Sequence, residues 1–110
     1  MNLTEKKCVP CEGGTAPLSR TEAALLLKEV SNWQLEDKMI RKQFKFKNFV
    51  EAIKFVNKVA AVAEAEGHHP DIEIKWNKVT LELWTHSIGG LSENDFIVAA
   101  KVNAILNSVS

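Results

Sequence analysis

The chain has 110 residues, which suits one domain with a single core and is too short for two independently folded halves. Its 14 Lys and Arg residues balance 14 Asp and Glu residues, so no net charge favours binding to a nucleic-acid backbone or an anionic membrane surface. No apolar run approaches the roughly 18 residues that span a bilayer, and the N-terminus lacks the apolar centre of a signal peptide. The sequence therefore predicts a cytoplasmic protein without direct nucleic-acid or membrane partners.

Residues 1–17 contain prolines and glycines without a hydrophobic period, which predicts an irregular N-terminal arm before a single domain at residues 18–110. The only two cysteines, Cys8 and Cys11, stand in this arm with C-x-x-C spacing. That spacing suits half of a zinc site or a redox disulfide, but a zinc site needs two further ligands and a redox site usually follows a buried strand. Unpaired surface thiols are therefore the favoured interpretation.

The first regular element is a helix that begins after a capping box. In Ser19-Arg20-Thr21-Glu22 the serine hydroxyl and the glutamate three residues later can satisfy backbone amides at the helix start. Apolar residues at helical spacing follow, and they predict a helix that ends near Ser31-Asn32. A hairpin comes next, with strands at residues 33–35 and 39–46. Lys42 falls on the apolar face of the second strand, so its stem is expected along the core edge with the ammonium in water.

The strongest helix pattern follows this hairpin. Asn48 and Glu51 have the spacing of an N-terminal cap, and an apolar stripe continues at helical spacing as far as Ala63. The stripe is wide, so the helix is expected to bury a second side, either within the domain or against another subunit. Gly67 is the expected residue after the helix because glycine adopts positive φ without strain, and Pro70 prevents the helix from resuming.

A second hairpin and a third helix complete the predicted fold. Alternating apolar residues predict a strand at residues 72–76, a turn at Asn77-Lys78 and a strand at residues 79–84. Ser92-Glu93-Asn94-Asp95 then opens the last helix as another capping box, which gives Asp95 a structural role as its third residue. The order helix, two strands, helix, two strands, helix predicts an α+β fold: a four-stranded antiparallel sheet with three helices on one face.

All three histidines lie at two neighbouring ends of predicted elements. His68 and His69 follow the long helix, and His86 stands at or just past the end of the last strand. Because the second hairpin leaves this corner and returns to it, the three imidazoles can line one cleft. A histidine pKa of roughly 6.5 allows proton uptake and release near neutrality. The cleft predicts proton-transfer chemistry, while a role in a turn is the alternative for any single histidine.

Other chemistry has less support in the sequence. A three-histidine zinc site is disfavoured because the adjacent side chains of His68 and His69 diverge and the helical H-x-x-x-H spacing is absent, so no metal is expected. No serine or cysteine has the setting of an activated nucleophile, and no glycine-rich loop has phosphate-binding spacing. Trp33, Trp76 and Trp84 can offer stacking surfaces to a planar ligand, although tryptophan in a small domain more often packs in the core.

Several motifs together resemble one enzyme family. They are Gly67-His68-His69-Pro70-Asp71, Trp76-Asn77-Lys78-Val79, Thr85-His86 and Gly89-Gly90-Leu91-Ser92-Glu93-x-Asp95. On these motifs the chain resembles the pterin-4a-carbinolamine dehydratases, from about Leu18 to Asn107. The resemblance implies removal of water from 4a-hydroxytetrahydrobiopterin, the product left by aromatic amino-acid hydroxylases, to give quinonoid dihydropterin in tetrahydrobiopterin recycling. It implies no cofactor and no metal.

The resemblance also implies roles for individual residues. His68 and His86 would form the acid–base pair, and His69 would orient the pterin or share that task. Four further residues would contribute to binding the substrate: Trp33, Glu64, Thr85 and Asp95.

Partners follow from the same resemblance. The family implies a small-molecule pterin substrate, a homodimer or homotetramer, and a functional link to an aromatic amino-acid hydroxylase. The alternative function is a pterin-binding or protein-binding module linked to transcription regulation or to molybdenum-cofactor enzymes. Such a module would bind its partner through the wide apolar helix at residues 48–66.

Overall fold

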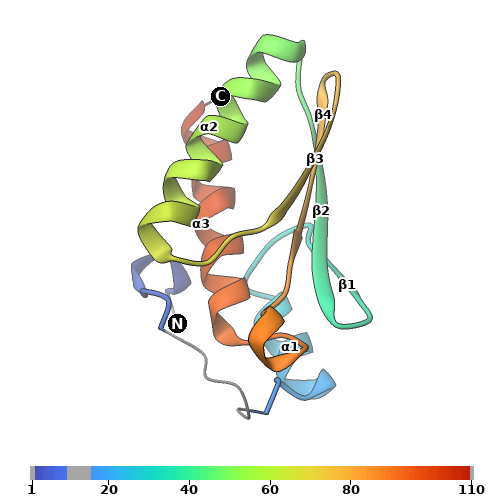
Figure 1. Cartoon of the computed structure of the whole chain (residues 1–110), viewed down its shortest axis with the longest axis vertical. Helices are drawn as coiled ribbons and strands as arrows, with labels where there is room; N and C mark the ends of the chain where they lie inside the picture. The colour runs from blue at the N-terminus through green and yellow to red at the C-terminus, as the bar shows by residue number, and fades with distance from the viewer. Residues whose placement is uncertain (1, 10–15, 110) are drawn as a thin grey trace.

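The computed structural model describes residues 2–9 and 16–109. They form four strands and three α-helices in the order α-β-β-α-β-β-α, so the predicted fold class is confirmed. A short 3-10 turn, η1 (Leu3–Glu5), precedes them and was not predicted. In Figure 1 the sheet stands nearly edge-on, with α2 and α3 side by side on one of its faces. Within the described residues, no helix is long and apolar enough to cross a membrane.

The sheet is antiparallel throughout and has the strand order β1-β2-β4-β3. Its strands are β1 (Gln34–Glu36), β2 (Met39–Lys45), β3 (Asp71–Lys75) and β4 (Lys78–Leu83). β4 therefore lies between β2 and β3, and its far end leads directly to the last histidine. β3 is an edge strand, and all five of its residues are exposed.

The core lies between the sheet and the helices. Apolar side chains of β4 alternate inward, and Val79, Leu81 and Leu83 are fully buried. They face α2 (Phe49–Glu66) and α3 (Glu93–Val109) across a layer that includes Phe55. The ring of Phe55 lies 4.8 Å from that of Phe44, centroid to centroid, which joins α2 to β2. Burial on this scale stabilises the fold by about 1.5–3 kcal/mol for each large apolar side chain.

Helix α2 begins and ends where the sequence predicts. The Asn48 side chain accepts a hydrogen bond from the Glu51 amide, and Gly67 ends the helix at a φ of 65°. The predicted apolar stripe of α2 is buried only in part. Ala52, Phe55, Val59 and Ala63 are buried, whereas Phe49, at the start of the helix, is 49% exposed. The first residue of the stripe lies beyond the cover of the sheet because it stands at the very start of the helix.

The first helix, α1 (Arg20–Leu27), starts with the predicted capping box. The prediction that it ends near Ser31-Asn32 is wrong, because the backbone tightens after Leu27. The amides of Glu29 and Val30 donate to carbonyls three residues earlier rather than four, as in a 3-10 turn. Val30 still reaches the core at 1% exposure, so its apolar character belongs to the core and not to a longer helix.

The turns of the two hairpins also differ from the predictions. In the second hairpin the loop is Trp76-Asn77, one residue earlier than the predicted Asn77-Lys78, and Trp76 takes a φ of 52°. Asn77 fixes this register by exchanging hydrogen bonds with Phe46: its carbonyl accepts from the Phe46 amide, and its side-chain amide donates to the Phe46 carbonyl. In the first hairpin, β1 begins at Gln34, one residue later than predicted. Trp33 lies just before this strand and is buried.

Candidate active site

The three histidines meet in one hollow, as the hairpin argument predicts. The hollow has a volume of about 520 Å³ and lies where the end of α2, the end of β4 and the start of α3 converge. Its lining includes His68 and His69 from the segment after α2, and Thr85 and His86 from the segment after β4. This histidine pocket therefore gathers groups that are far apart in the sequence.

The end of α2 places the first two histidines. Gly67 turns the chain out of the helix with a left-handed φ of 65°, and the amide of His68 donates to the carbonyl of Ala63 at 3.2 Å. Pro70 is buried and leads the chain into β3. Glycine suits this position because other residues are strained at such a φ.

Asp95 and His68 form a largely buried polar contact at the pocket. The His68 Nε2 atom lies 2.6 Å from Asp95 Oδ1, and the Asp95 side chain is fully buried. The other carboxylate oxygen, Oδ2, accepts from the Ser92 amide and from the Thr85 hydroxyl, each at 2.9 Å. Since the Thr85 proton is used in this way, the Ser92 hydroxyl donates to Thr85 across 2.7 Å.

This network determines which nitrogen of His68 carries the proton. An ionised carboxylate only accepts hydrogen bonds, so the Nε2 atom facing Asp95 is the protonated nitrogen. The Nδ1 atom then holds the lone pair of the neutral imidazole. A neighbouring carboxylate also stabilises the imidazolium that forms when Nδ1 accepts a proton. The arrangement therefore suits His68 to act as a general base.

The two remaining histidines are more open to solvent. His69 Nε2 lies 2.5 Å from Glu64 Oε2, and the two side chains are 58% and 78% exposed. The ring of His86 stacks on that of Trp84, with centroids 3.8 Å apart and planes at 27°. The ammonium of Lys38 also contacts the Trp84 ring, with Nζ 5.1 Å from its centroid. His86 is thus held at the pocket by a flat aromatic surface and stays accessible.

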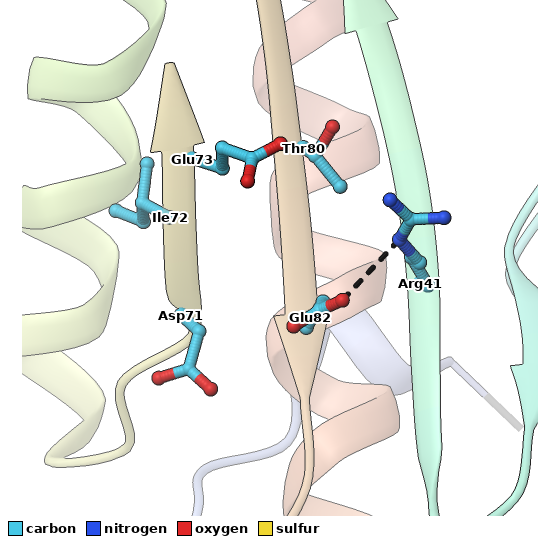
Figure 2. A pocket seen from close by; sticks show the side chains of 6 residues that line it. All are labelled: Arg41, Asp71, Ile72, Glu73, Thr80 and Glu82. Carbon is cyan, nitrogen blue, oxygen red and sulfur yellow. Dashed lines mark ion pairs between the residues drawn. The ribbon is translucent and has the colours of Figure 1, made fainter.

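A second hollow lies on the outer face of the sheet (Figure 2) and offers different chemistry. It has a volume of about 210 Å³, and within it Arg41 Nε pairs with Glu82 Oε2 at 3.3 Å. The residues that line it are Arg41, Asp71, Ile72, Glu73, Thr80 and Glu82. None of these is a histidine, so the histidine pocket is the stronger candidate for proton transfer near neutrality. Within the part of the chain that the structure describes, no group of three His, Cys, Asp or Glu residues is placed to hold a metal ion.

Comparison with known proteins agrees with this geometry. A family model described as Pterin 4 alpha carbinolamine dehydratase matches residues 16–105. The chain belongs to the pterin-4a-carbinolamine dehydratase family. It is accordingly an enzyme of the hydro-lyase class, and the family resemblance seen in the sequence is confirmed.

Individual dehydratase-family relatives cover most of the chain. A protein of Halorhodospira halophila, provisionally named pterin-4-alpha-carbinolamine dehydratase, is 51% identical over 107 residues, which are 96% of this chain and 98% of that protein. The crystal structure of a Brucella melitensis transcriptional coactivator/pterin dehydratase has a TM-score of 0.78 at 37% identity, covering 81% of this chain and 97% of that one. A pterin dehydratase-like RuBisCO assembly factor of the alpha-carboxysome has a TM-score of 0.55 at 28% identity, over 66% and 84% of the two chains.

The residues assigned from the dehydratase family fall into two groups. Thr85 lines the histidine pocket, and Asp95 and Glu64 each contact one of its histidines. Trp33 is not brought to this pocket: it is 4% exposed, and its indole Nε1 donates to Asn103 Oδ1 at 3.1 Å. Trp84, for which the sequence indicated only a possible stacking surface, lines the pocket instead.

Two further pocket residues, Val9 and Asn94, were not predicted. Asn94 was seen only as part of a capping box, and Val9 only as part of an irregular arm. No signal within either segment marks them, because the contact joins residues that are 85 positions apart. Cys8 lies next to Val9 as a free, half-buried thiol, whereas Cys11 lies outside the described residues.

Proposed function

We propose that this chain dehydrates 4a-hydroxytetrahydrobiopterin to quinonoid dihydropterin by histidine acid–base catalysis, in tetrahydrobiopterin recycling after an aromatic amino-acid hydroxylase. Membership of the dehydratase family supports the reaction class. The observation that carries the proposal is the 2.6 Å contact between His68 and the buried Asp95, in a pocket that also contains His69 and His86.

The reaction needs two proton transfers. The bond between C4a and the hydroxyl oxygen breaks, and the oxygen must be protonated so that it leaves as water. The N5 atom loses its proton, and its electron pair forms the C4a=N5 double bond. A general acid and a general base placed on either side of this bond therefore suffice, and neither electrons nor a further reactant are required.

His68 and His86 suit these two roles. His68 takes the N5 proton, because Asp95 orients its imidazole and stabilises the resulting imidazolium. His86 protonates the departing hydroxyl, because its ring is held against Trp84 while its nitrogens stay accessible. His69 orients the pterin and is itself positioned by Glu64.

The decay of the carbinolamine after rapid mixing tests these assignments. After subtraction of the rate without enzyme, we expect His68→Ala and His86→Ala each to lose about 10²- to 10⁴-fold in kcat relative to the wild type, the usual contribution of one acid or base. Asn57→Ala, an exposed change on α2, serves as the control that retains full activity. If His86→Ala matched the wild-type rate, His86 would have no catalytic role.

A second candidate function is a protein-binding module, linked to transcription regulation or to molybdenum-cofactor enzymes. Its support is an exposed apolar surface on the β3–β4 hairpin and on the first turn of α2, with Trp76 at 67% and Val50 at 60% exposure. The Brucella protein is named a transcriptional coactivator, and the carboxysome protein is named a RuBisCO assembly factor. Loss of dehydratase activity in His68→Ala without loss of the cellular phenotype would favour this function.

A further inference from the structure

The N-terminal arm, residues 2–9, is fastened along the start of α3. Leu3 inserts into the core with 3% of its surface exposed. Lys6 Nζ then contacts both carboxylate oxygens of Glu93, at 3.2 and 3.0 Å. These contacts lead the arm from the body of the domain to the first turn of α3, where Val9 and Asn94 line the histidine pocket.

At its described end the arm is held by a two-point clamp. The Val9 amide donates to Asn94 Oδ1 at 3.0 Å, and Asn94 Nδ2 donates to the Val9 carbonyl at 2.6 Å. The Asn94 side chain thus pairs with Val9 as a neighbouring strand would, and Asn94 is only 5% exposed. The amide of Cys8 adds a third bond, to Glu66 Oε1 at 2.9 Å. The backbone of residues 8 and 9 is therefore fixed in both position and direction.

The clamp places a specific kind of side chain at the pocket. Among the described residues that line the pocket, Val9 is the one with a branched aliphatic side chain, and the others are mostly polar or aromatic. Val9 is 64% exposed, so a ligand in the pocket can cover its methyl groups. Asn94, which holds Val9, directly precedes Asp95, which holds His68.

We propose that the arm forms one wall of the substrate site, with Val9 as a specificity-determining residue and Asn94 as the residue that positions it. This inference rests on the proposed function, because the substrate is taken to be a pterin. Val9 contacts a part of the substrate that does not react, and it thereby selects among pterins that differ in the group they carry on the ring.

The first experiment measures discrimination between two substrates. Carbinolamines bearing a methyl group or a three-carbon dihydroxy side chain at C6 are compared by kcat/KM. Val9→Ala and Val9→Phe should change the ratio of the two values in opposite directions, each by about 3- to 10-fold, the effect expected for one or two buried methylene groups. Leu25→Ala, a change at a similarly exposed apolar residue on α1, should leave the ratio unchanged.

The second experiment separates positioning from stability. Asn94→Asp keeps an acceptor for the Val9 amide but sets a carboxylate against the Val9 carbonyl, so the clamp opens. A carboxylate at the second position of α3 favours the helix, but Asn94 is only 5% exposed, so the melting temperature will fall and KM is measured well below it. We expect KM to rise about 3- to 10-fold with little change in kcat, because Val9 no longer contacts the substrate while His68 and His86 keep their places.

Equilibrium binding distinguishes failure of this inference from failure of the proposed function. The probes are 7,8-dihydropterins with the same two C6 groups, titrated into the full chain by calorimetry. A wild-type chain that neither binds them nor accelerates carbinolamine decay would overturn the function and the inference together. Normal wild-type activity with unchanged substrate ratios in both Val9 variants, and unchanged KM in Asn94→Asp, would overturn the role of the arm alone.

Discussion

At the scale of single residues, the pocket depends on how one carboxylate is shared. Asp95 accepts hydrogen bonds from Ser92, Thr85 and His68, and its side chain has no exposed surface. Two of these donors reach the same oxygen, Oδ2, and His68 alone reaches Oδ1. The two carboxylate oxygens are therefore chemically distinct: Oδ2 accepts from Ser92 and Thr85, and Oδ1 contacts His68.

This asymmetry predicts the effect of Asp95→Asn. The amide oxygen of asparagine will face Ser92 and Thr85, which both donate, so its NH₂ group will face His68. His68 must then accept at Nε2 and carry its proton on Nδ1, where the base needs a lone pair. We expect kcat to fall by about 10²-fold or more, approaching that of His68→Ala. Nitrogen chemical shifts of His68 would report the exchanged tautomer.

Asp37→Asn is the matched control, because Asp37 is exposed in the first hairpin turn with a φ of 53°, which asparagine tolerates. Undiminished kcat in Asp95→Asn would contradict the assignment of His68 as the base.

Several residues show why the site was only partly predictable. The three histidines and Asp95 were found because their motifs are local in the sequence. Trp33 was assigned to the pocket by resemblance, yet its indole donates a hydrogen bond to Asn103. Lys42 was expected to place its ammonium in water, but the ammonium also donates to Asn103. Burial lowers the pKa of Lys42. Contacts of this kind depend on how β2 and α3 meet, which no local pattern records.

At the scale of elements, an ion pair joins α2, α3 and the arm. Lys101 Nζ on α3 lies 2.6 Å from Glu66 Oε2 at the end of α2, and their side chains are 18% and 7% exposed. The hydrogen bond from Lys101, followed by that from the Cys8 amide, lowers the pKa of Glu66 below its ordinary value of 4.5. Burial, followed by the charge of Glu66, raises the pKa of the Cys8 thiol to about 12, so Cys8 stays protonated near neutrality.

The lowered pKa of Glu66 predicts how stability depends on pH. A carboxylate with a depressed folded pKa stabilises the fold above its ordinary value of 4.5, and this contribution is lost as the pH falls through the folded pKa. Glu66→Gln removes the titrating group, so its melting temperature should fall less than that of the wild type between about pH 7 and about pH 3. Glu29→Gln, at an exposed position after α1, should follow the wild-type curve. Parallel curves for wild type and Glu66→Gln would contradict this linkage.

Element boundaries were predictable where a side chain acts on its own backbone. Ser19, Asn48 and Gly67 cap helices through residues next to them, and all three appear as predicted. The end of α1 was not predictable, because Val30 is apolar at helical spacing but reaches the core through a 3-10 turn. The second hairpin turn was predicted one residue late because a bulky residue with positive φ, such as Trp76, is unusual. The register is visible only in the hydrogen bonds that Asn77 exchanges with Phe46.

At the scale of the whole molecule, one edge of the sheet is uncovered. β3 has a neighbour on one side only, and Ile72 and Ile74 remain 39% and 40% exposed although they pair with buried residues of β4. Trp76 lies at the tip of the same hairpin, and in Figure 1 this tip stands at the same end of the molecule as the start of α2. An unpaired strand edge with apolar side chains is a surface that a second chain can cover.

We therefore expect the protein to form a homodimer or a homotetramer through this surface. Sedimentation equilibrium should give two or four times the mass of one chain. Ile74→Lys places a charge on the apolar edge, and it should shift the distribution toward monomer. Lys58→Glu on the exposed side of α2 is a charge-changing control. A wild-type protein that is monomeric at all concentrations would contradict this expectation.

The position of Asp95 in the third residue of α3 has a consequence for motion. The ends of helices open more readily than their centres, and they do so without unfolding of the whole domain. Each opening of this first turn would release the hydrogen bond of Ser92 to Asp95, and with it the orientation of His68. Catalytic activity thus depends on the closed state of this turn. Activity should therefore be lost at a lower denaturant concentration than the one at which the sheet unfolds.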